Sequence, residues 1–218
     1  MNVNPKKIAL IGLGLRTTQK IIPSLMPLVS EGKVNVIAVC DCDETKLDSF
    51  RAFPSATPFA SVQALLAWHA SGHPIDVAYI SLPHKAQASV TSVVLMKGIH
   101  CLKEKPSAIS VDELYHLVQV SRNAGARLGI ASQRRFSEKV RKLKEWIQLV
   151  GAVSSCEIVS KIPVEDLTAG WRAQRALCGG GVVLDLGWHS FVSRPSLLAS
   201  RRSAVVANLR VAFGRETS

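Results

Sequence analysis

Residues 8–17 read Ile-Ala-Leu-Ile-Gly-Leu-Gly-Leu-Arg-Thr, and this stretch decides the fold. An apolar run typical of a buried strand ends at Gly12, and Gly14 follows two residues later. The first glycine permits a tight turn, and the second lets backbone N–H groups approach a pyrophosphate at the N-terminus of a following helix. The turn alone is a weak indication of dinucleotide binding, because Thr17 stands where a third glycine is usual.

The next apolar run strengthens the indication. Val34–Cys40 is rich in β-branched residues and is followed directly by Asp41. An acidic side chain there can accept hydrogen bonds from both hydroxyls of an adenosine ribose. It would also repel a 2′-phosphate, which favours NAD over NADP without excluding NADP. The alternative is that Asp41 or Asp43 caps a helix over Glu44–Phe50, and both interpretations can hold because the two carboxylates belong to different residues.

The first 133 residues alternate between short apolar runs and longer segments with helical spacing. Strands and helices that alternate at this pitch predict an α/β domain with a doubly wound parallel sheet and right-handed crossovers. The predicted strands are Lys7–Ile11, Val34–Val39, Val77–Ser81, His100–Leu102 and Arg127–Ala131. We therefore expect a Rossmann dinucleotide-binding domain over residues 1–133.

The pattern changes in residues 134–218, which we expect to form a second domain. Ser137–Val150 has the spacing of an amphipathic helix with a basic outer face, and Ala152–Ser160 resembles a strand. Residues 161–178 show no clear period and predict a long loop. Three glycines then precede an apolar helix, and Ala204–Phe213 predicts a last strand.

Composition excludes several classes of protein. Hydrophobic residues make up 47% of the 218, so the chain is neither disordered nor collagen-like. No apolar stretch approaches the ~20 residues that span a bilayer, so no membrane association is expected. The net charge is +11, and the excess lies mainly in residues 121–218, which carry 16 basic and 7 acidic groups. A nucleic-acid partner is not expected, because no recognition motif is present and aromatics are only 6%.

The five cysteines indicate neither a disulfide framework nor a metal site. Their number is odd and their positions are scattered, which favours a reducing compartment, the cytoplasm. Cys40 and Cys42 have no second pair downstream, so we expect no zinc site and no other metal.

A lysine stands where ligands bind in parallel sheets. Glu104-Lys105-Pro106 follows a predicted central strand, whose carboxyl end faces the ligand-binding edge. Proline restricts the backbone of the residue before it, which would hold Lys105 in a defined turn. From spacing alone, Lys105 is either a functional group or an ordinary surface lysine.

Taken together, these motifs resemble the Gfo/Idh/MocA family of NAD(P)-dependent oxidoreductases, which includes glucose–fructose oxidoreductase and inositol dehydrogenases. The resemblance covers residues 6 to about 190. It rests on Gly12-x-Gly14, Ala38-Val39-Cys40-Asp41, Ser81-Leu82-Pro83-His84, Glu104-Lys105-Pro106, Trp171-Arg172 and the run from Gly179-Gly180-Gly181 through Asp185 to His189. It implies a Rossmann domain followed by an α+β domain with a mostly antiparallel sheet.

The resemblance also implies roles for individual residues. Lys105, Asp185 and His189 would be catalytic, and Trp171 and Arg172 would contact substrate together with Lys105 and His189. The implied cofactor-binding residues are Gly12, Gly14, Leu15, Arg16, Asp41, Leu82, Pro83, His84, Glu104 and Lys105. His84 and Gln87 depart from the family pattern, which more often has asparagine and histidine at these positions.

The residue chemistry is compatible with these roles. Asp185 and His189 are four apart and would share one face of a helix, where the carboxylate can orient the imidazole. His189 can then accept the proton of a substrate hydroxyl while Lys105 stabilises the charge on its oxygen. The alternative for Asp185 and His189 is an ordinary intrahelical pair, and for Arg172 a structural salt bridge.

The expected function is hydride transfer between NAD(P) and a secondary alcohol of a sugar, cyclitol or similar polyol. The alternative is a catalytically weak or inactive relative that only binds a dinucleotide. The sequence stops soon after the Asp-x-x-x-His segment, so we expect a second domain that is incomplete, or truncated, compared with the family. A homo-oligomer fits the family, although the sheet face that usually forms its interface would be incomplete.

Overall fold

The computed structural model describes residues 4–150, 158–161, 170–185, 187–188 and 209–212. The chain divides into two compact units, Met1–Ala131 and Ser132–Ser218.

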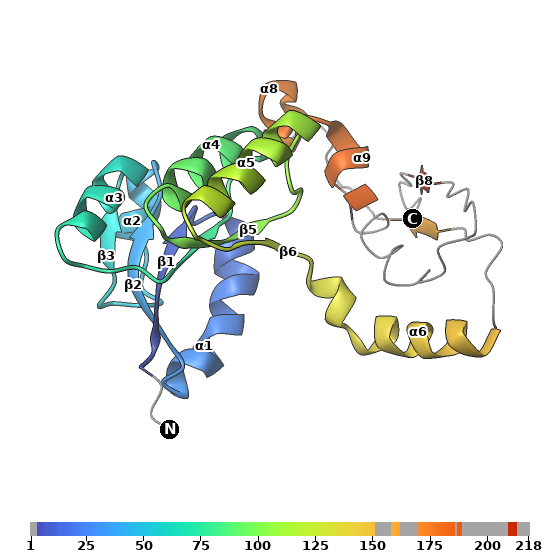
Figure 1. The fold of residues 1–218 in the computed structure, drawn as a ribbon, viewed down its shortest axis with the longest axis horizontal. Coiled ribbons are helices and arrows are strands. Elements are labelled where there is room, and N and C mark those ends of the chain that lie inside the picture. Colours follow the sequence, from blue (N-terminus) through green and yellow to red (C-terminus); the bar gives the residue numbers. More distant parts are fainter. Residues whose placement is uncertain (1–3, 151–157, 162–169, 186, 189–208, 213–218) are drawn as a thin grey trace, which may run out of the picture. The chain divides into compact units, whose positions relative to one another are not determined.

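The first unit is built on a six-stranded sheet in which every neighbouring pair of strands is parallel (Figure 1). The strand order is β3-β2-β1-β4-β5-β6, the order of a dinucleotide-binding Rossmann sheet. The predicted doubly wound α/β fold is therefore confirmed. The strands are β1 (Lys6–Ile11), β2 (Val34–Cys40), β3 (Thr57–Phe59), β4 (Val77–Ile80), β5 (His100–Glu104) and β6 (Leu128–Ala131).

The edge strand β3 is absent from the sequence-based expectations. It has only three residues and contains Pro58, a residue that usually argues against a strand. Proline is tolerated there because β3 pairs with β2 alone, at the edge of the sheet.

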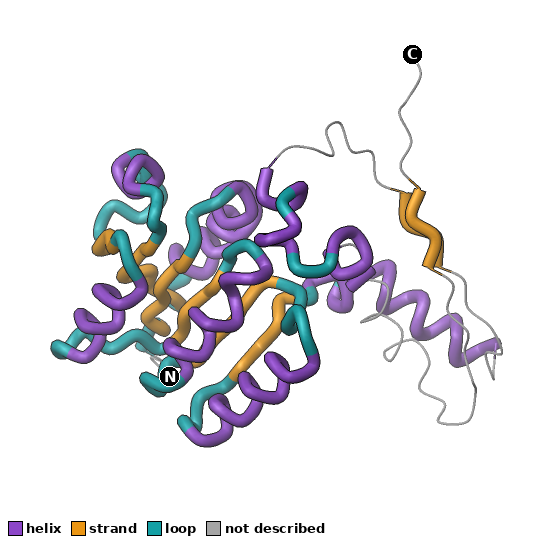
Figure 2. Tube along the Cα trace, turned by 90° about the horizontal axis from the view of Figure 1, so that it is seen from above, coloured by secondary structure: helices purple, strands orange, loops and turns teal. Residues whose placement is uncertain are grey.

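Helices cover both faces of the sheet (Figure 2). One buried cluster joins α3, α4 and α5 to alternate residues of the central strands, including Ala9 and Ile11 of β1. A second cluster joins α1 and α2 to the other face through Ile8 and Leu10. The helical segments are η1 (Thr17–Ile21), α1 (Ile22–Ser30), α2 (Glu44–Asp48), α3 (Val62–Ala70), α4 (His84–Leu95) and α5 (Val111–Asn123).

Side-chain caps define where three of these helices begin. Asp43, Ser61 and Ser110 precede α2, α3 and α5, and each accepts a hydrogen bond from a backbone N–H two or three residues later. Such caps satisfy donors that have no acceptor within the helix and stabilise it by about 1 kcal/mol each. The capping role considered for Asp43 is thus confirmed.

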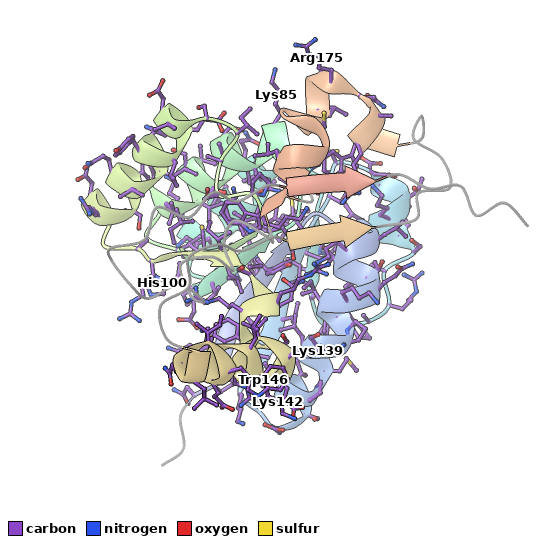
Figure 3. The ribbon with its side chains drawn as sticks, turned by 90° about the vertical axis from the view of Figure 1, so that its right-hand side faces the viewer. Lys85, His100, Lys139, Lys142, Trp146 and Arg175 are labelled. Atoms are coloured by element: carbon purple, nitrogen blue, oxygen red, sulfur yellow. The ribbon has the colours of Figure 1, made fainter. Side chains whose placement is uncertain are left out.

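The second unit contains a long helix and several short elements. These are η2 (Gln133–Phe136), α6 (Glu138–Val150), β7 (Ile158–Lys161), α7 (Gly170–Ala173), α8 (Arg175–Cys178), α9 (Gly181–Asp185) and β8 (Leu209–Ala212). The helix predicted over Ser137–Val150 is confirmed, and Lys139, Lys142 and Trp146 are labelled on it in Figure 3. The prediction of a continuous loop over 161–178 is wrong at α7 and α8, which are single turns too short to show a period.

Strands β7 and β8 pair in parallel. This differs from the mostly antiparallel sheet that the family resemblance implies. A parallel pair needs a crossover connection of a dozen or more residues, and residues 162–208 supply that length. The rest of the expected strands over 152–160 and 204–213 lies outside the described residues.

In the described part of the chain, no helix combines the length and the apolar character needed to cross a membrane.

Candidate functional site

The Gly12 turn lies at the point where the strand order reverses. β1 and β4 are neighbours, and the chain runs from β1 to β2 on one side and from β4 to β5 on the other, so the connections leave these two carboxyl ends in opposite directions. Ligands bind at such a point in open α/β sheets. Gly12 has φ +91°, and its N–H donates to the Cys40 carbonyl at 2.8 Å. A Cβ at this position would lie 2.1 Å from the Ser81 carbonyl oxygen, so only glycine fits between the two neighbouring strand ends.

The second glycine faces open space, unlike the first. A Cβ added to Gly14 would meet nothing within 4 Å. Helical structure follows from Thr17, and the first N–H groups of a helix have no acceptor within it. The turn therefore leaves room, and offers donors, for a pyrophosphate.

Thr17 replaces the third glycine with a hydrogen bond. Its side chain is fully buried, and its Oγ1 donates to the Gly12 carbonyl at 2.6 Å. Sequence reasoning treated Thr17 as a loss of match, whereas the hydroxyl ties the start of the helix to the turn. A small residue with a donor, five positions after the first glycine, is the signal that indicates this role.

Asp41 lies beside the turn, as expected for the acid that ends the second long strand. It is buried, and its Oδ2 accepts the Leu13 N–H at 2.7 Å. Its Oδ1 accepts the Asp43 N–H at 3.0 Å and lies 3.5 Å from Lys46 Nζ. The carboxylate is thus held at the glycine turn by the chain itself.

Arg16 of the turn is joined to the Glu104-Lys105-Pro106 segment. Arg16 Nε donates to Glu104 Oε1 at 2.8 Å, and the Tyr79 hydroxyl donates to the same oxygen. Burial, together with the hydrogen bond to Glu104, raises the pKa of Tyr79 far above its ordinary value. Sequence reasoning missed Tyr79, whose polar hydroxyl in an apolar central strand was the available signal.

The segment after β4 also lies against the glycine turn. A Cβ on Gly12 would be 3.0 Å from the Leu82 side chain. Pro83 precedes α4, and His84 opens it with a side chain only 4% exposed. Gln87 Nε2 donates to the Leu82 carbonyl at 2.9 Å, which fixes the segment from within α4.

Lys105 follows the last residue of β5 and is half-buried. It lies between Glu104, which Arg16 and Tyr79 hold, and Pro106, which is buried. The first unit therefore brings Lys105 to the same sheet edge as the glycine turn, since parallel strands end at one edge.

In the second unit, Arg172 connects two of the expected site residues. Its guanidinium lies over the Trp171 ring, 4.5 Å from the centroid, and its Nε donates to Asp185 Oδ2 at 2.8 Å. This is the salt bridge considered for Arg172. His189 lies outside the described residues. Lys105 belongs to the first unit and Asp185 to the second, so their convergence stays a prediction.

Two of the described cysteines are buried in the core of the first unit. Burial raises the pKa of Cys40 and of Cys101 to about 12, which keeps both as inert thiols. His100, labelled in Figure 3, accepts the Arg127 N–H through Nδ1. Within the same described residues, no three His, Cys, Asp or Glu side chains gather in a way that could hold a metal ion.

Comparison with known families agrees with this geometry. The profile of the oxidoreductase family with an NAD-binding Rossmann fold (GFO_IDH_MocA) matches residues 6–132. The chain belongs to this family. The resemblance drawn from the motifs is thereby confirmed, and NAD or NADP is the cofactor class of the family.

Individual relatives are distant and longer. The putative UDP-kanosamine synthase oxidoreductase subunit of Amycolatopsis mediterranei (strain S699) is 26% identical over 187 residues, which cover 84% of this chain and 49% of that protein. The 1-carboxy-3-chloro-3,4-dihydroxycyclohexa-1,5-diene dehydrogenase of Comamonas testosteroni is 25% identical over 187 residues, 84% of this chain and 45% of that protein. The chain thus spans about half the length of these curated relatives.

Solved structures share the fold. The WlbA dehydrogenase from Bordetella pertussis, solved in complex with NADH and UDP-GlcNAcA, superposes with a TM-score of 0.79 at 20% identity. The superposition covers 90% of this chain and 56% of that one. At this identity the likeness shows the fold alone.

Proposed function

We propose that the protein transfers a hydride between NAD(P) and a secondary alcohol of a sugar, cyclitol or similar polyol. One observation carries the proposal: the 2.8 Å bond from Arg16 to Glu104 joins the glycine turn to the segment that presents Lys105. A dinucleotide loop and a candidate catalytic lysine are thereby tied together at one sheet edge. The names of the two curated relatives, a sugar-nucleotide enzyme and a cyclic diol dehydrogenase, support this substrate class.

In this proposal, residues 1–133 hold the dinucleotide. The N–H groups of Gly14, Leu15 and Arg16 bind its pyrophosphate, and Asp41 binds the adenosine ribose. The segment Leu82–His84, together with Glu104 and Lys105, lies along the nicotinamide side. The open space over Gly14 and the buried carboxylate beside the turn both fit such a ligand. Bound NAD(P) supplies the hydride acceptor.

Side chains of the protein bind the substrate hydroxyl and accept its proton. Residues 134–218 form the part of the protein that binds the substrate. The Lys105 ammonium holds the hydroxyl oxygen and stabilises negative charge as it develops. His189 accepts the hydroxyl proton at its ring nitrogen, a contribution of typically ~10²–10⁴-fold in rate. Asp185 orients His189, while Arg172 holds Asp185 Oδ2 and lies against Trp171.

A second function, dinucleotide binding with weak or absent catalysis, is supported by the same Arg172–Asp185 contact. The Arg172 guanidinium donates to Asp185 Oδ2 at 2.8 Å, so the salt bridge engages the side chain that would otherwise contact substrate. If Arg172 serves only this salt bridge, the substrate loses a contact residue.

We propose a cytoplasmic protein that binds a small-molecule substrate and no nucleic acid. Self-association is proposed only as the homo-oligomer that fits the family. Cys42 is exposed as a thiol, which suits a reducing compartment.

The cofactor proposal is tested by Gly14→Ala. Because a Cβ at position 14 meets open space and φ is ordinary there, the substitution leaves thermal unfolding unchanged or slightly raised. It nevertheless weakens NADH binding, followed by NADH fluorescence, by about tenfold or more. A variant that binds NADH as the parent does contradicts the proposed cradle.

The redox proposal is tested with Lys105→Ala and His189→Ala in assays of sugar and cyclitol oxidation. Both variants lose turnover, and His189→Ala keeps the NADH affinity of the parent. If the parent binds NADH but shows no turnover, the second function, dinucleotide binding without catalysis, is supported instead.

A further inference from the structure

Lys103 carries a buried amine that the proposed mechanism does not use. It lies on β5, paired with Ile80 of β4 on one side and with Ile130 of β6 on the other, and its side chain is 1% exposed. Aliphatic neighbours on both strands make an apolar residue the natural occupant of this position. Burial disfavours the charged ammonium and lowers the pKa of Lys103 to about 8. A group that is so costly to bury must make compensating contacts.

Those contacts are directed at the turn after Lys105. Lys103 Nζ donates to the carbonyl oxygens of Pro106 and Ser107, each at 2.8 Å. Two successive carbonyls that converge on one amine fix the orientation of the peptide planes between them. Both carbonyls would lose their donor if the amine were removed, and an unsatisfied buried carbonyl is destabilising.

The far end of the same turn is tied by α5. Glu113 Oε2 accepts the Ile109 N–H at 3.1 Å, while Ser110 caps the helix through the Glu113 N–H. The carboxylate of Glu113 is also the charge that acts on Lys103, where it favours the ammonium form. The connection between β5 and α5 is therefore held by one side chain from each element.

Lys105 is in this way fixed on both sides. Glu104 before it is bonded to Arg16 and lies on one face of the strand. Pro106 after it is bonded to Lys103, whose side chain lies on the opposite face because successive strand residues alternate. Contacts on both faces leave the Lys105 backbone little freedom.

We propose that Lys103 is a positioning residue, whose amine holds the turn that presents the Lys105 ammonium to the substrate. The inference rests on the proposed function of Lys105. No contact of Lys103 with cofactor or substrate is required.

The test uses the full chain with Lys103→Met, which keeps the length of the side chain and removes its donors. Lys97→Met, at an exposed position after α4, is the matched control. Hydrogen exchange read by mass spectrometry is followed in the peptide over residues 104–112. Loss of two hydrogen bonds raises the exchange rate there about 10- to 100-fold, while exchange in β4 stays at the parent rate.

Kinetics and labelling give the second readout. In Lys103→Met, kcat for polyol oxidation falls about 10- to 100-fold, as expected for a displaced catalytic group, while KM and NADH affinity stay within about twofold. The rate at which acetic anhydride labels Lys105 rises as the turn loosens. Lys103→Gln, which keeps an N–H donor group on a shorter, uncharged side chain, lies between parent and Lys103→Met. It carries the test if Lys103→Met does not fold.

Unchanged exchange over 104–112, or exchange that rises equally in β4, overturns the positioning role. An active parent whose kcat is unaffected by Lys103→Met overturns it as well. If the parent itself shows no turnover, the proposed function fails. The role of Lys103 is then still decided by the exchange rate over residues 104–112 and by the labelling rate of Lys105.

Discussion

Lys103→Met removes a contribution to the stability of the protein that rises with pH in the alkaline range. The pKa of Lys103 falls from 10.5, its ordinary value, to about 8 in the folded protein because the side chain is buried. Between these two values Lys103 binds more protons in the unfolded chain than in the folded one, so its contribution to the free energy of unfolding of the parent rises with pH. Methionine has no proton to lose, and the variant lacks this rise.

The magnitude follows from the same two pKa values. A difference of about 2.5 corresponds to about 3 kcal/mol, since each pKa unit is worth about 1.4 kcal/mol. With a side chain only 1% exposed, solvent screening takes little from this figure. Most of the change, about 2 kcal/mol, falls between pH 7.5 and pH 10.

Urea unfolding followed by circular dichroism at pH 7.5 and pH 10 measures the effect. With a slope of ~1–3 kcal/mol per molar urea, the parent midpoint rises by roughly 1–2 M relative to that of Lys103→Met. Cys40, Cys101 and Tyr79 oppose the rise as pH approaches 10, because burial raises their pKa values, but they do so in parent and variant alike. An equal pH dependence in the parent and in Lys103→Met refutes the reasoning, and Lys97→Met serves as the control that keeps the parent behaviour.

Three further substitutions test local contacts. Gly12→Ala combines φ +91° with a Cβ 2.1 Å from the carbonyl oxygen of Ser81, so thermal unfolding shows that the free energy of unfolding falls by about 3 kcal/mol or more. In the control Gly32→Ala, with φ +66° and open space around the Cβ, it falls by only about 1–2 kcal/mol. Equal losses in the two variants contradict the clash at Gly12. Glu104→Gln weakens the bond to Arg16 and lowers the unfolding free energy by about 1–3 kcal/mol. A change below about 0.5 kcal/mol, the size usual for surface substitutions, contradicts this. Ser110→Ala removes the cap of α5 and costs about 1 kcal/mol in urea unfolding; an unchanged midpoint shows that the cap is replaced by water.

The sequence alone was sufficient for the elements whose cause is local. Apolar runs and helical spacing are properties of neighbouring residues, and they place β1, β2, β4, β5 and β6 close to where the structure has them. The Gly12–Gly14 turn and Asp41 were predicted for the same reason, because strand, turn and terminal acid follow one another in the chain. The short elements β3, α7 and α8 were not predicted, because three or four residues are too few to show a repeating pattern.

Only the tertiary structure decided which distant residues meet. Arg16 and Glu104 are 88 residues apart in the sequence, and they pair because β1 and β5 flank β4 and end at the same edge. Lys103 directly follows the predicted strand His100–Leu102, and nothing local says whether its amine reaches solvent or folds back onto the turn. Hydrogen bonds of this kind depend on strand order and on packing across the sheet, which no single segment encodes.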